Sequence, residues 1–543
     1  MDGDGRAVRS HDGPRLPLAL RVALATTPAA VLVVFYAWPL ATLLGRVVDT
    51  GTLGDTWRRP GLGRIAWFTL WQATVSTAVT LAVGLAPAWL LARWRFPGRR
   101  LLAALTTAPF LLPTVVVGAA FLALLPARFA TGAPAIIAAH VFFNVAVIVR
   151  VVGALWEQLP DDLTGAARTL GASPWRAFRE ITFPLLRPAI TAAASVVFLF
   201  TFTSFGVVQV LGGARRPTLE VEIARRAIQV GDVGGAAVLA VAQLAVLGAL
   251  VAWSARAQRR AATHLRLRPG RRRVAARPRE RWVVAAIALA TAVAMAAPLV
   301  VLASQSLRPG GRWSLAAWRG LGRSEVRPGL SLGVDPLASI GVSLRYAAAA
   351  TAISVVLGAA GALAIAAARR RGRLLDLGMM LPLGTSAVTL GLGMLITFDH
   401  APVDWRDEPW LIPLGHALVA TPFVVRSVLP VLRSRPDGWL DAAATLGASP
   451  TRAWLAIDVA LLRRPLAIGA GFAAAISLGE LGATTFLTRT GRESLPIAIA
   501  RLLGRAGDLP RAEAFALATI LAGLTIVVIV VVEALQPDGE AAR

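Results

Sequence analysis

The chain has 543 residues, of which 56% are apolar and only 16% are charged, and its mean hydropathy is +0.64. This composition excludes a soluble or disordered chain, and the recurring apolar runs of about 20 residues predict a polytopic membrane protein. The net charge of +26 comes from arginine without lysine and forms no separate basic domain, which argues against nucleic acid as a partner, and the absence of cysteine excludes disulfides and thiolate-ligated metal sites.

Twelve apolar runs are expected to cross the membrane as helices, which predicts an all-α polytopic fold. The alternating ten-residue segments of a membrane β-barrel are absent from the sequence. The first run lacks an A-x-A-like cleavage site, so we expect an anchor and not a signal peptide. The runs lie near residues 18–45, 65–92, 101–125, 134–157, 189–212, 235–255, 282–303, 338–368, 376–398, 409–432, 464–487 and 513–535.

The placement of arginine predicts the orientation of these runs. The loops after the second, sixth and eighth runs are rich in arginine, and the connection at residues 256–281 holds eleven arginines against one acid, Glu280. The loop at residues 399–408 is acidic instead. By the positive-inside rule the arginine-rich loops are cytoplasmic. Both termini are therefore expected in the cytoplasm.

A repeat at an offset of 276 residues divides the chain into two halves. Residues 165–177 read GAARTLGASPWRA and residues 441–453 read DAAATLGASPTRA, so ten of thirteen positions are identical. Each copy falls between the fourth and fifth run of its half, which predicts parallel halves related by a pseudo-two-fold axis along the membrane normal. The expected domains are a first transmembrane domain at 1–255, an arginine-rich cytoplasmic linker at 256–281 and a second transmembrane domain at 282–543.

Each copy of the repeat predicts two short helices separated by a glycine. In the first copy Asp161 or Asp162 is expected to cap the first helix. Gly171 follows where a positive φ commonly ends a helix, and Ser173 and Pro174 are typical of the start of the next one. Two angled helices with small side chains form a projection suited to a groove on another protein.

The repeated segment resembles the EAA motif, roughly E-A-A-x(3)-G-x(9)-I-x-L-P, of permease subunits of binding-protein-dependent ABC importers. Glycine replaces the leading acid in the first copy, and the second copy lacks the final Leu-Pro. The resemblance covers nearly the whole chain. The matching residues are Gly165, Ala166, Ala167, Gly171, Ile181 and Pro184 in the first copy and Asp441, Ala442, Ala443, Gly447 and Ile457 in the second.

This resemblance implies a function and its partners. The EAA loops would be the coupling helices that dock on cytoplasmic ABC ATPase subunits, with two copies expected, and an extracytoplasmic solute-binding protein would deliver the solute. The chain would lie among lipids of a bacterial inner membrane and work by ATP-driven alternating access. Fused permeases with two EAA loops are most similar to ferric-iron and thiamine importers, and the sequence leaves both solutes open.

No catalytic or cofactor site is expected in the chain itself. A phosphate-binding loop G-x(4)-G-K-[ST] is impossible without lysine, so ATP is expected to bind the partner subunit. No nucleophile, base and metal set converges in the sequence, and the five histidines are too scattered for a metal cluster. We therefore expect a transport subunit that is not an enzyme.

Three residues are candidates for the translocation path. Glu480 lies inside the eleventh run, where a carboxylate is costly and usually faces a cavity or a partner. The alternative is a structural hydrogen bond. His140 and His416 are related by the repeat, which also favours a packing role. Glu220 and Glu222 are expected as solvated charges just outside the membrane.

An ATP-independent secondary transporter with two six-helix halves is the alternative function. That class also contains parallel repeats. It requires no ATPase, and it offers no reason for a repeated short helix between the fourth and fifth run of each half.

Overall fold

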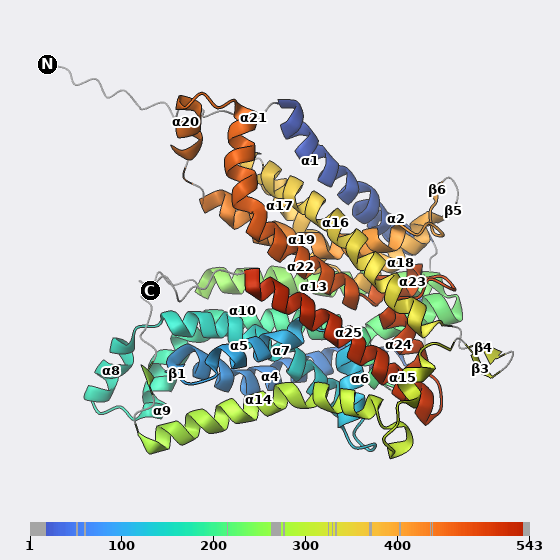
Figure 1. Cartoon of the computed structure of the whole chain (residues 1–543), viewed down its shortest axis with the longest axis horizontal. Helices are drawn as coiled ribbons and strands as arrows, with labels where there is room; N and C mark the ends of the chain where they lie inside the picture. Colours follow the sequence, from blue (N-terminus) through green and yellow to red (C-terminus); the bar gives the residue numbers. More distant parts are fainter. Residues whose placement is uncertain are drawn as a thin grey trace.

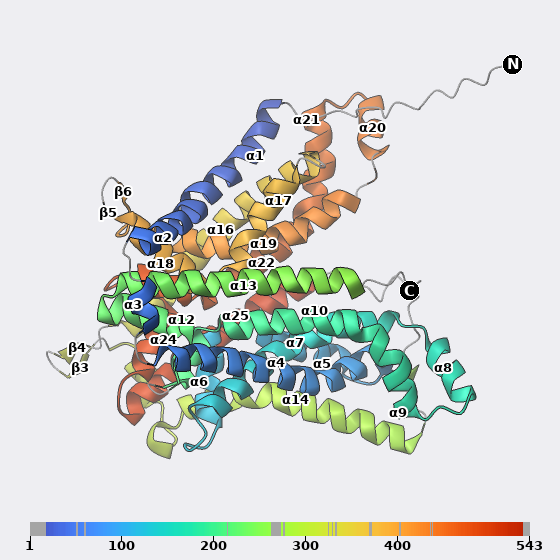
Figure 2. The ribbon, with the colours of Figure 1, turned by 180° about the vertical axis from the view of Figure 1, so that it is seen from behind.

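The computed structural model describes residues 18–49, 53–58, 61–213, 216–261, 273–274, 277–323, 325–327, 330–331, 334–368, 372–400, 403–434, 436 and 438–535. The described part is almost entirely helical (Figures 1 and 2). The helices before the linker are α1 (Leu18–Leu32), η1 (Val33–Ala37), α2 (Trp38–Asp49), α3 (Leu53–Arg58), α4 (Leu62–Arg93), α5 (Arg99–Thr107), η2 (Ala108–Leu111), α6 (Thr114–Leu124), α7 (Ala133–Gln158), α8 (Asp161–Thr169), α9 (Pro174–Ala177), η3 (Phe178–Thr182), α10 (Phe183–Phe202), α11 (Gly206–Leu211), α12 (Leu219–Ala224), η4 (Arg225–Val230) and α13 (Val233–Ala261).

The second half repeats this order of elements. Its helices are α14 (Pro278–Ser306), η5 (Pro309–Gly311), α15 (Ala316–Gly320), α16 (Pro336–Ala368), α17 (Arg373–Met380), η7 (Leu381–Gly384), α18 (Ala387–Phe398), α19 (Leu411–Ser434), α20 (Gly438–Thr445), α21 (Pro450–Ala453), η8 (Trp454–Val459), α22 (Ala460–Gly479), α23 (Gly482–Leu487), α24 (Leu495–Leu503) and α25 (Asp508–Leu535). The described strands form three two-stranded pairings, namely β1 (Trp94–Arg95) with β2 (Arg273–Val274), β3 (Glu325–Arg327) with β4 (Leu330–Ser331), and β5 (Asp399–His400) with β6 (Val403–Asp404).

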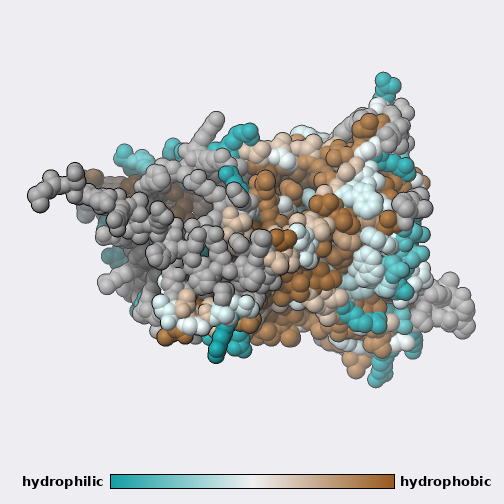
Figure 3. Space-filling view, turned by 90° about the horizontal axis from the view of Figure 1, so that it is seen from above, coloured by the Kyte–Doolittle hydropathy of each residue, from teal (hydrophilic) through white to brown (hydrophobic). Residues whose placement is uncertain are grey.

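The prediction of an all-α polytopic membrane protein is confirmed. Among the described residues, ten helices are long and apolar enough to cross a membrane, and two bent helix pairs raise the number to at most twelve. Large apolar side chains such as Trp67 and Val300 are each 65% exposed, as expected for surfaces that face lipid. In the space-filling view a broad apolar band is flanked at one end by hydrophilic residues (Figure 3).

Two of the twelve expected spans are not straight, which corrects the sequence interpretation. The run at 101–125 consists of Arg99–Leu111 and Thr114–Leu124 at an angle of 108°, and the run at 376–398 consists of Arg373–Gly384 and Ala387–Phe398 at 100°. A proline lies in the short 3-10 turn before each break, Pro109 in η2 and Pro382 in η7, and its missing N–H group interrupts the regular hydrogen bonding. Hydropathy alone does not report this change of direction.

The molecule has two lobes, and each lobe holds the first helix of the other half. The lower lobe in Figure 1 contains α4, α5, α7 and α10, and the upper lobe contains α16, α17, α19 and α22. The first-half helix α1 packs against α16 and α17, whereas the second-half helix α14 packs against α4, α5 and α6. The sequence halves are thus interlocked by exchanged first helices. The predicted linker at 256–281 is partly helical, because α13 continues to Ala261 and α14 begins at Pro278.

Repeat-related glycines allow the broken segments to pack tightly at the centre. A Cβ added to Gly206 would lie 2.3 Å from Thr114 Oγ1 and 3.2 Å from the Val115 nitrogen. A Cβ at Gly482 would lie 3.1 Å from both the Ala387 Cβ and the Val388 nitrogen. In each half the start of a short helix, α11 or α23, therefore rests directly on the break of the bent pair.

Candidate functional site

A central cavity of about 280 Å³ lies between the two halves. Its walls come from the breaks of both bent pairs, from the ends of α10 and α22, and from α7 and α19. The lining is mostly apolar, and Glu480 is the carboxylate among the described lining residues. The aromatic lining residues are Phe110, Phe143, Phe200, Phe205 and Phe423. Such a cavity, apolar with few polar groups, is typical of a site for a small organic molecule.

Glu480 lines the cavity but does not lie inside a helix, which corrects the sequence interpretation. It follows the last residue of α22, and its carboxylate caps α23 by accepting hydrogen bonds from the backbone N–H groups of Ala483 and Thr484, each at 2.9 Å. The Thr484 hydroxyl donates a further bond of 2.7 Å to Glu480 Oε2. The structural hydrogen bonds that the sequence left as the alternative are therefore present.

His416 lies behind Glu480 and does not line the cavity. Its Nδ1 is 2.8 Å from the Ser477 hydroxyl, and its Nε2 is 2.7 Å from Thr484 Oγ1 and 3.4 Å from Glu480 Oε2. Because Thr484 gives its single hydroxyl proton to Glu480, Nε2 of His416 is the donor to Thr484. This network ties α19 and α22 to the start of α23.

His140 occupies the equivalent position in the first half, but its surroundings differ. Its Nδ1 is 3.2 Å from the Ser76 hydroxyl, while its Nε2 has no hydrogen-bond partner among the described residues. The positions that match Glu480 and Thr484 hold Ser204 and Val208. His140 lines the cavity, so the two predicted histidines have different environments.

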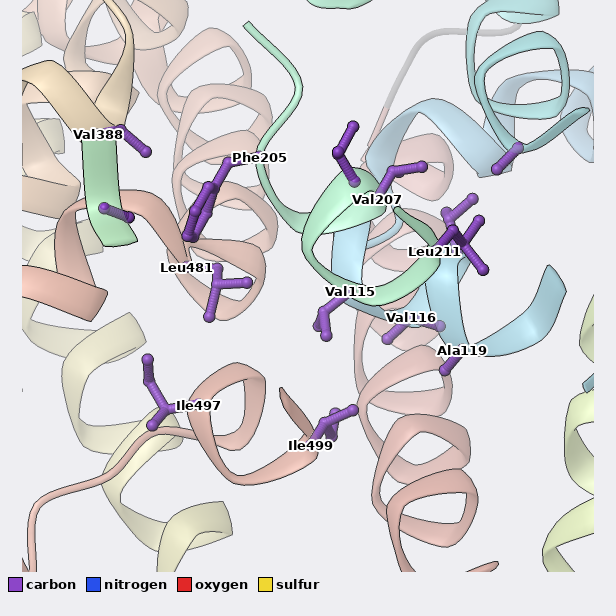
Figure 4. Close-up of a cluster of buried hydrophobic side chains, with 14 of the residues drawn as sticks. Val115, Val116, Ala119, Phe205, Val207, Leu211, Val388, Leu481, Ile497 and Ile499 are labelled. Atoms are coloured by element: carbon purple, nitrogen blue, oxygen red, sulfur yellow. The ribbon is translucent and has the colours of Figure 1, made fainter. Parts of the chain in front are cut away.

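Phe205 and Leu481 close one side of the cavity. They are related by the repeat, both are buried, and Figure 4 shows them next to each other with Val388 close by. Phe205 also lines a second cavity of about 820 Å³, formed by the start of α4 together with α12 and η4. One aromatic side chain thus stands between two cavities.

Glu220 and Glu222 are buried, contrary to the expectation of solvated charges. The Gln243 side chain donates a hydrogen bond to Glu220. Arg225 and Arg226 each donate to Glu222 Oε1 at 2.8 Å. Burial raises the pKa of Glu222, but these hydrogen bonds outweigh it, so the pKa lies below its ordinary value. Sequence hydropathy around α12 gave no sign of this packing.

The two repeated loops have the predicted helix–glycine–helix geometry. Gly171 and Gly447 have φ values of 86° and 77°. The Ala172 N–H group donates to the Ala167 oxygen at 3.0 Å, and Ala448 donates to Ala443 at 3.0 Å, which is the Schellman ending of a helix. The first helix starts at Asp161 without a side-chain cap, so neither expected aspartate cap is present.

The second short helix of each loop begins as predicted. The Ser173 hydroxyl accepts a hydrogen bond from the Arg176 N–H group at 3.2 Å. The Ser449 hydroxyl accepts the equivalent bond from Arg452 at 3.4 Å. These serine caps set the angle at which the second helix leaves the glycine.

The repeated loops project from the molecule and expose an apolar residue at the same position. Leu170 is 88% exposed and Leu446 is 87% exposed, directly before the two glycines. Gly165, Ala166 and Ala442 are also exposed, whereas the predicted motif residues Ala167, Ala443, Ile181, Pro184 and Ile457 are half-buried. Asp441 begins the second copy within α20. Each loop thus presents one exposed leucine next to exposed small residues at the same place in the repeat.

A continuous helix joins each exposed loop to the cavity. The helix Pro174–Phe202 has 29 residues, about 40 Å at 1.5 Å per residue. It ends directly before Thr203 and Ser204, which line the cavity. Its counterpart runs from Pro450 to Gly479 and ends at Glu480. A π-helical segment occurs at the same place in both, η3 and η8. Movement of a loop would therefore reach the cavity along one element.

Comparison with known proteins shows a family to which part of the chain is similar. Residues 78–264 match the family described as "Binding-protein-dependent transport system inner membrane component". This segment of the chain is similar to that family. It holds α7 to α10, the first repeated loop and His140, and the match confirms the resemblance seen in the sequence.

Relatives of similar length extend the likeness over most of the chain. The chain is 28% identical over 505 residues to the thiamine transport system permease protein ThiP of Brucella suis biovar 1, covering 87% of each chain. It is 25% identical over 498 residues to ThiP of Salmonella typhimurium, covering 88% of this chain and 90% of that protein. The sulfate transport system permease protein CysT of Escherichia coli is 35% identical over 158 residues, 27% of this chain and 57% of that protein. The fused permease of an ABC importer fits these findings.

Sequence reasoning missed several residues of the central site. The aromatic residues Phe110, Phe143 and Phe200 looked like ordinary residues of apolar runs, because their convergence depends on the bend between η2 and α6. Ser386 and Thr385 were missed for the same reason at the second bend. The repeat was the available signal, since Phe205 and Leu481 occupy matching positions.

Proposed function

We propose that this permease carries thiamine across a bacterial inner membrane, driven by ATP that separate ABC ATPase subunits hydrolyse. The observation that carries the proposal is the aromatic cavity with one carboxylate between two halves. Thiamine is a cation with two flat rings, so aromatic faces and Glu480 suit its charge and shape. The similarity to thiamine permeases over 87% of the chain supports the same solute.

Ferric iron is the other solute that the sequence left open, and its chemistry fits less well. Iron(III) favours several oxygen ligands, whereas the described residues contain no group of three or more His, Asp or Glu side chains that could hold a metal ion. Delivery by an extracytoplasmic binding protein applies to either solute. We therefore place thiamine first.

The coupling of ATP hydrolysis to transport is assigned to the two repeated loops. Leu170 and Leu446, with Gly165–Ala167 and Asp441–Ala443 before them, would each enter a groove of one ATPase subunit. The end of the molecule that carries α8 and α20 would then face the cytoplasm, together with both termini. Closure of the ATPase pair would draw the two loops together, and the helices that begin at Pro174 and Pro450 would pass the movement to the cavity.

The opening of the cavity is assigned to Phe205 and Leu481. Both line the central cavity, and Phe205 also lines the second cavity, so a displacement of Phe205 would connect the two. Glu480 and His140 would line the path, and His416 would act behind it by holding Glu480. No part of this cycle requires a cofactor in the chain itself.

A reconstitution experiment tests the function. The permease, its ATPase and its binding protein are placed in proteoliposomes, and ATP-dependent uptake of labelled thiamine is measured beside uptake of ferric iron. We expect thiamine uptake that requires both partner proteins. Uptake of iron without thiamine would contradict the solute, and uptake without the ATPase would favour the secondary transporter.

Exchange of the exposed leucines tests the coupling. The double variant Leu170→Asp and Leu446→Asp should lose at least tenfold in uptake while the purified permease keeps its melting temperature, because both side chains are solvent-exposed. The matched control is Leu315→Asp, since Leu315 is 54% exposed beside α15 at the opposite end of the molecule (Figure 1). Normal uptake by the double variant would contradict the coupling role.

A further inference from the structure

Two buried polar groups of the first half face the central cavity without a partner. His140 and Asn144 are 2% and 1% exposed, and both line the cavity. Neither His140 Nε2 nor Asn144 Oδ1 has a hydrogen-bond partner among the described residues. Buried polar groups are nearly always paired, because an unpaired one costs about 1–3 kcal/mol. Two such groups on one wall indicate that the solute itself supplies their hydrogen-bond partners.

The local hydrogen bonds leave one polar side-chain atom of each residue unused. Asn144 donates from Nδ2 to the His140 backbone oxygen at 2.9 Å, so its Oδ1 acceptor is the free end of the amide. His140 uses Nδ1 for the Ser76 hydroxyl on α4. We take the Ser76 hydroxyl as the donor to Nδ1, which leaves the proton of the neutral ring on Nε2. One helical turn of α7 therefore presents one donor and one acceptor side by side.

The second half has no such pair. Ala420 stands at the position that matches Asn144, and Nε2 of His416 is already bonded to Thr484. The second half instead supplies the carboxylate of Glu480. The cavity thus has a neutral wall with a donor and an acceptor, and a wall with a negative charge.

We propose that His140 and Asn144 bind the aminopyrimidine edge of the solute, an assignment that rests on the proposed function in thiamine transport. The amino group donates to Asn144 Oδ1, and the adjacent ring nitrogen accepts from His140 Nε2. Asparagine accepts in the same way from the amino group of adenine, where its own amide N–H provides the donor that His140 Nε2 provides here. Phe110 and Phe143, whose ring centroids are 5.5 Å apart, provide the apolar surface beside the ring, and the cationic ring of the solute lies toward Glu480.

The test measures ring recognition by the permease separately from its binding protein. The complex of permease and ATPase is placed in nanodiscs without the binding protein, and binding of thiamine is compared with binding of its 4-oxo analogue, which replaces the amino donor by an acceptor. We expect the wild type to prefer thiamine at least tenfold. Asn144→Ala should bring the ratio close to one, because it removes the acceptor for the amino group.

Two further variants keep the test independent of folding. His140→Gln retains an N–H donor in place of Nε2 and should keep most of the preference for thiamine. Val151→Ala on the same helix, at a side chain that is 37% exposed, is the matched control and should behave as wild type.

The outcomes separate this inference from the proposed function. If the wild type imports thiamine but binds both compounds equally, His140 and Asn144 do not recognise the aminopyrimidine ring. The same conclusion follows if Asn144→Ala keeps the tenfold preference for thiamine over the 4-oxo analogue. If the reconstituted importer carries no thiamine, the proposed function fails, and this inference fails with it.

Discussion

The two walls of the cavity descend from one repeated unit but differ in how their polar groups are satisfied. In the second half His416, Ser477, Thr484 and Glu480 form a closed network that caps α23. In the first half His140 keeps one ring nitrogen unpaired, and Ser204 stands where the carboxylate would be. The repeated loops, the long helices that follow them and the bends are alike in the two halves. The polar side chains at the central cavity differ.

The largest effect is expected from breaking the closed network. Glu480→Leu leaves the Ala483 and Thr484 N–H groups without acceptors in an apolar site, a cost of about 2–3 kcal/mol. We expect a lower melting temperature of the purified permease and loss of uptake in proteoliposomes. The control is Ser204→Ala at the matching position, which should change stability by less than about 0.5 kcal/mol. Equal effects of the two substitutions would contradict the difference between the walls.

A smaller difference is expected at the glycines under the two short helices. Gly206→Ala forces a methyl group to within 2.3 Å of Thr114 Oγ1, and overpacking of this kind costs about 1–3 kcal/mol. Gly482→Ala meets its nearest atoms at 3.1 Å and should cost less. Thermal unfolding in detergent shows which of the two variants loses more stability. A more damaging Gly482→Ala would show that the second half is the more tightly packed.

The smallest effect concerns the ion pairs of α12, because Ala498 matches Glu222 in the second half. Since hydrogen bonds from Arg225 and Arg226 lower the pKa of Glu222, its stabilisation is present at neutral pH and declines as the pH falls below the ordinary value of 4.5. Glu222→Gln should therefore lower the melting temperature at pH 7. The difference in melting temperature between the variant and the wild type should become smaller at acid pH. A melting-temperature difference that grows on acidification would contradict a stabilising role of the ionised Glu222 carboxylate.

The sequence was sufficient where the information is local. Helix termination by Gly171 and Gly447 and the serine caps at Ser173 and Ser449 depend on residues within a few positions, and the structure has them as predicted. The exception is the start of α8, where an aspartate was expected as the cap. There the helix begins at the aspartate itself, after a proline.

The path residues show where local information ends. Glu480 was identified because a carboxylate in an apolar run is costly, yet the same reasoning placed it inside a helix. Its partners come from a helix more than sixty residues away as well as from its own turn, so no local pattern distinguishes a cap from a ligand. His140 and His416 looked alike for the same reason.

The sequence by itself determined that this is an all-α membrane protein with a helix–glycine–helix loop at two repeat-related places, because hydropathy, repeat spacing and helix-ending residues act over short stretches of chain. Only the tertiary structure decided which spans bend, which lobe holds α1 and α14, and which side chains meet in the cavity. An apolar run reports that a segment avoids water, but it does not report the direction of the backbone. The partner of a buried polar group is chosen by helices that pack from far along the chain.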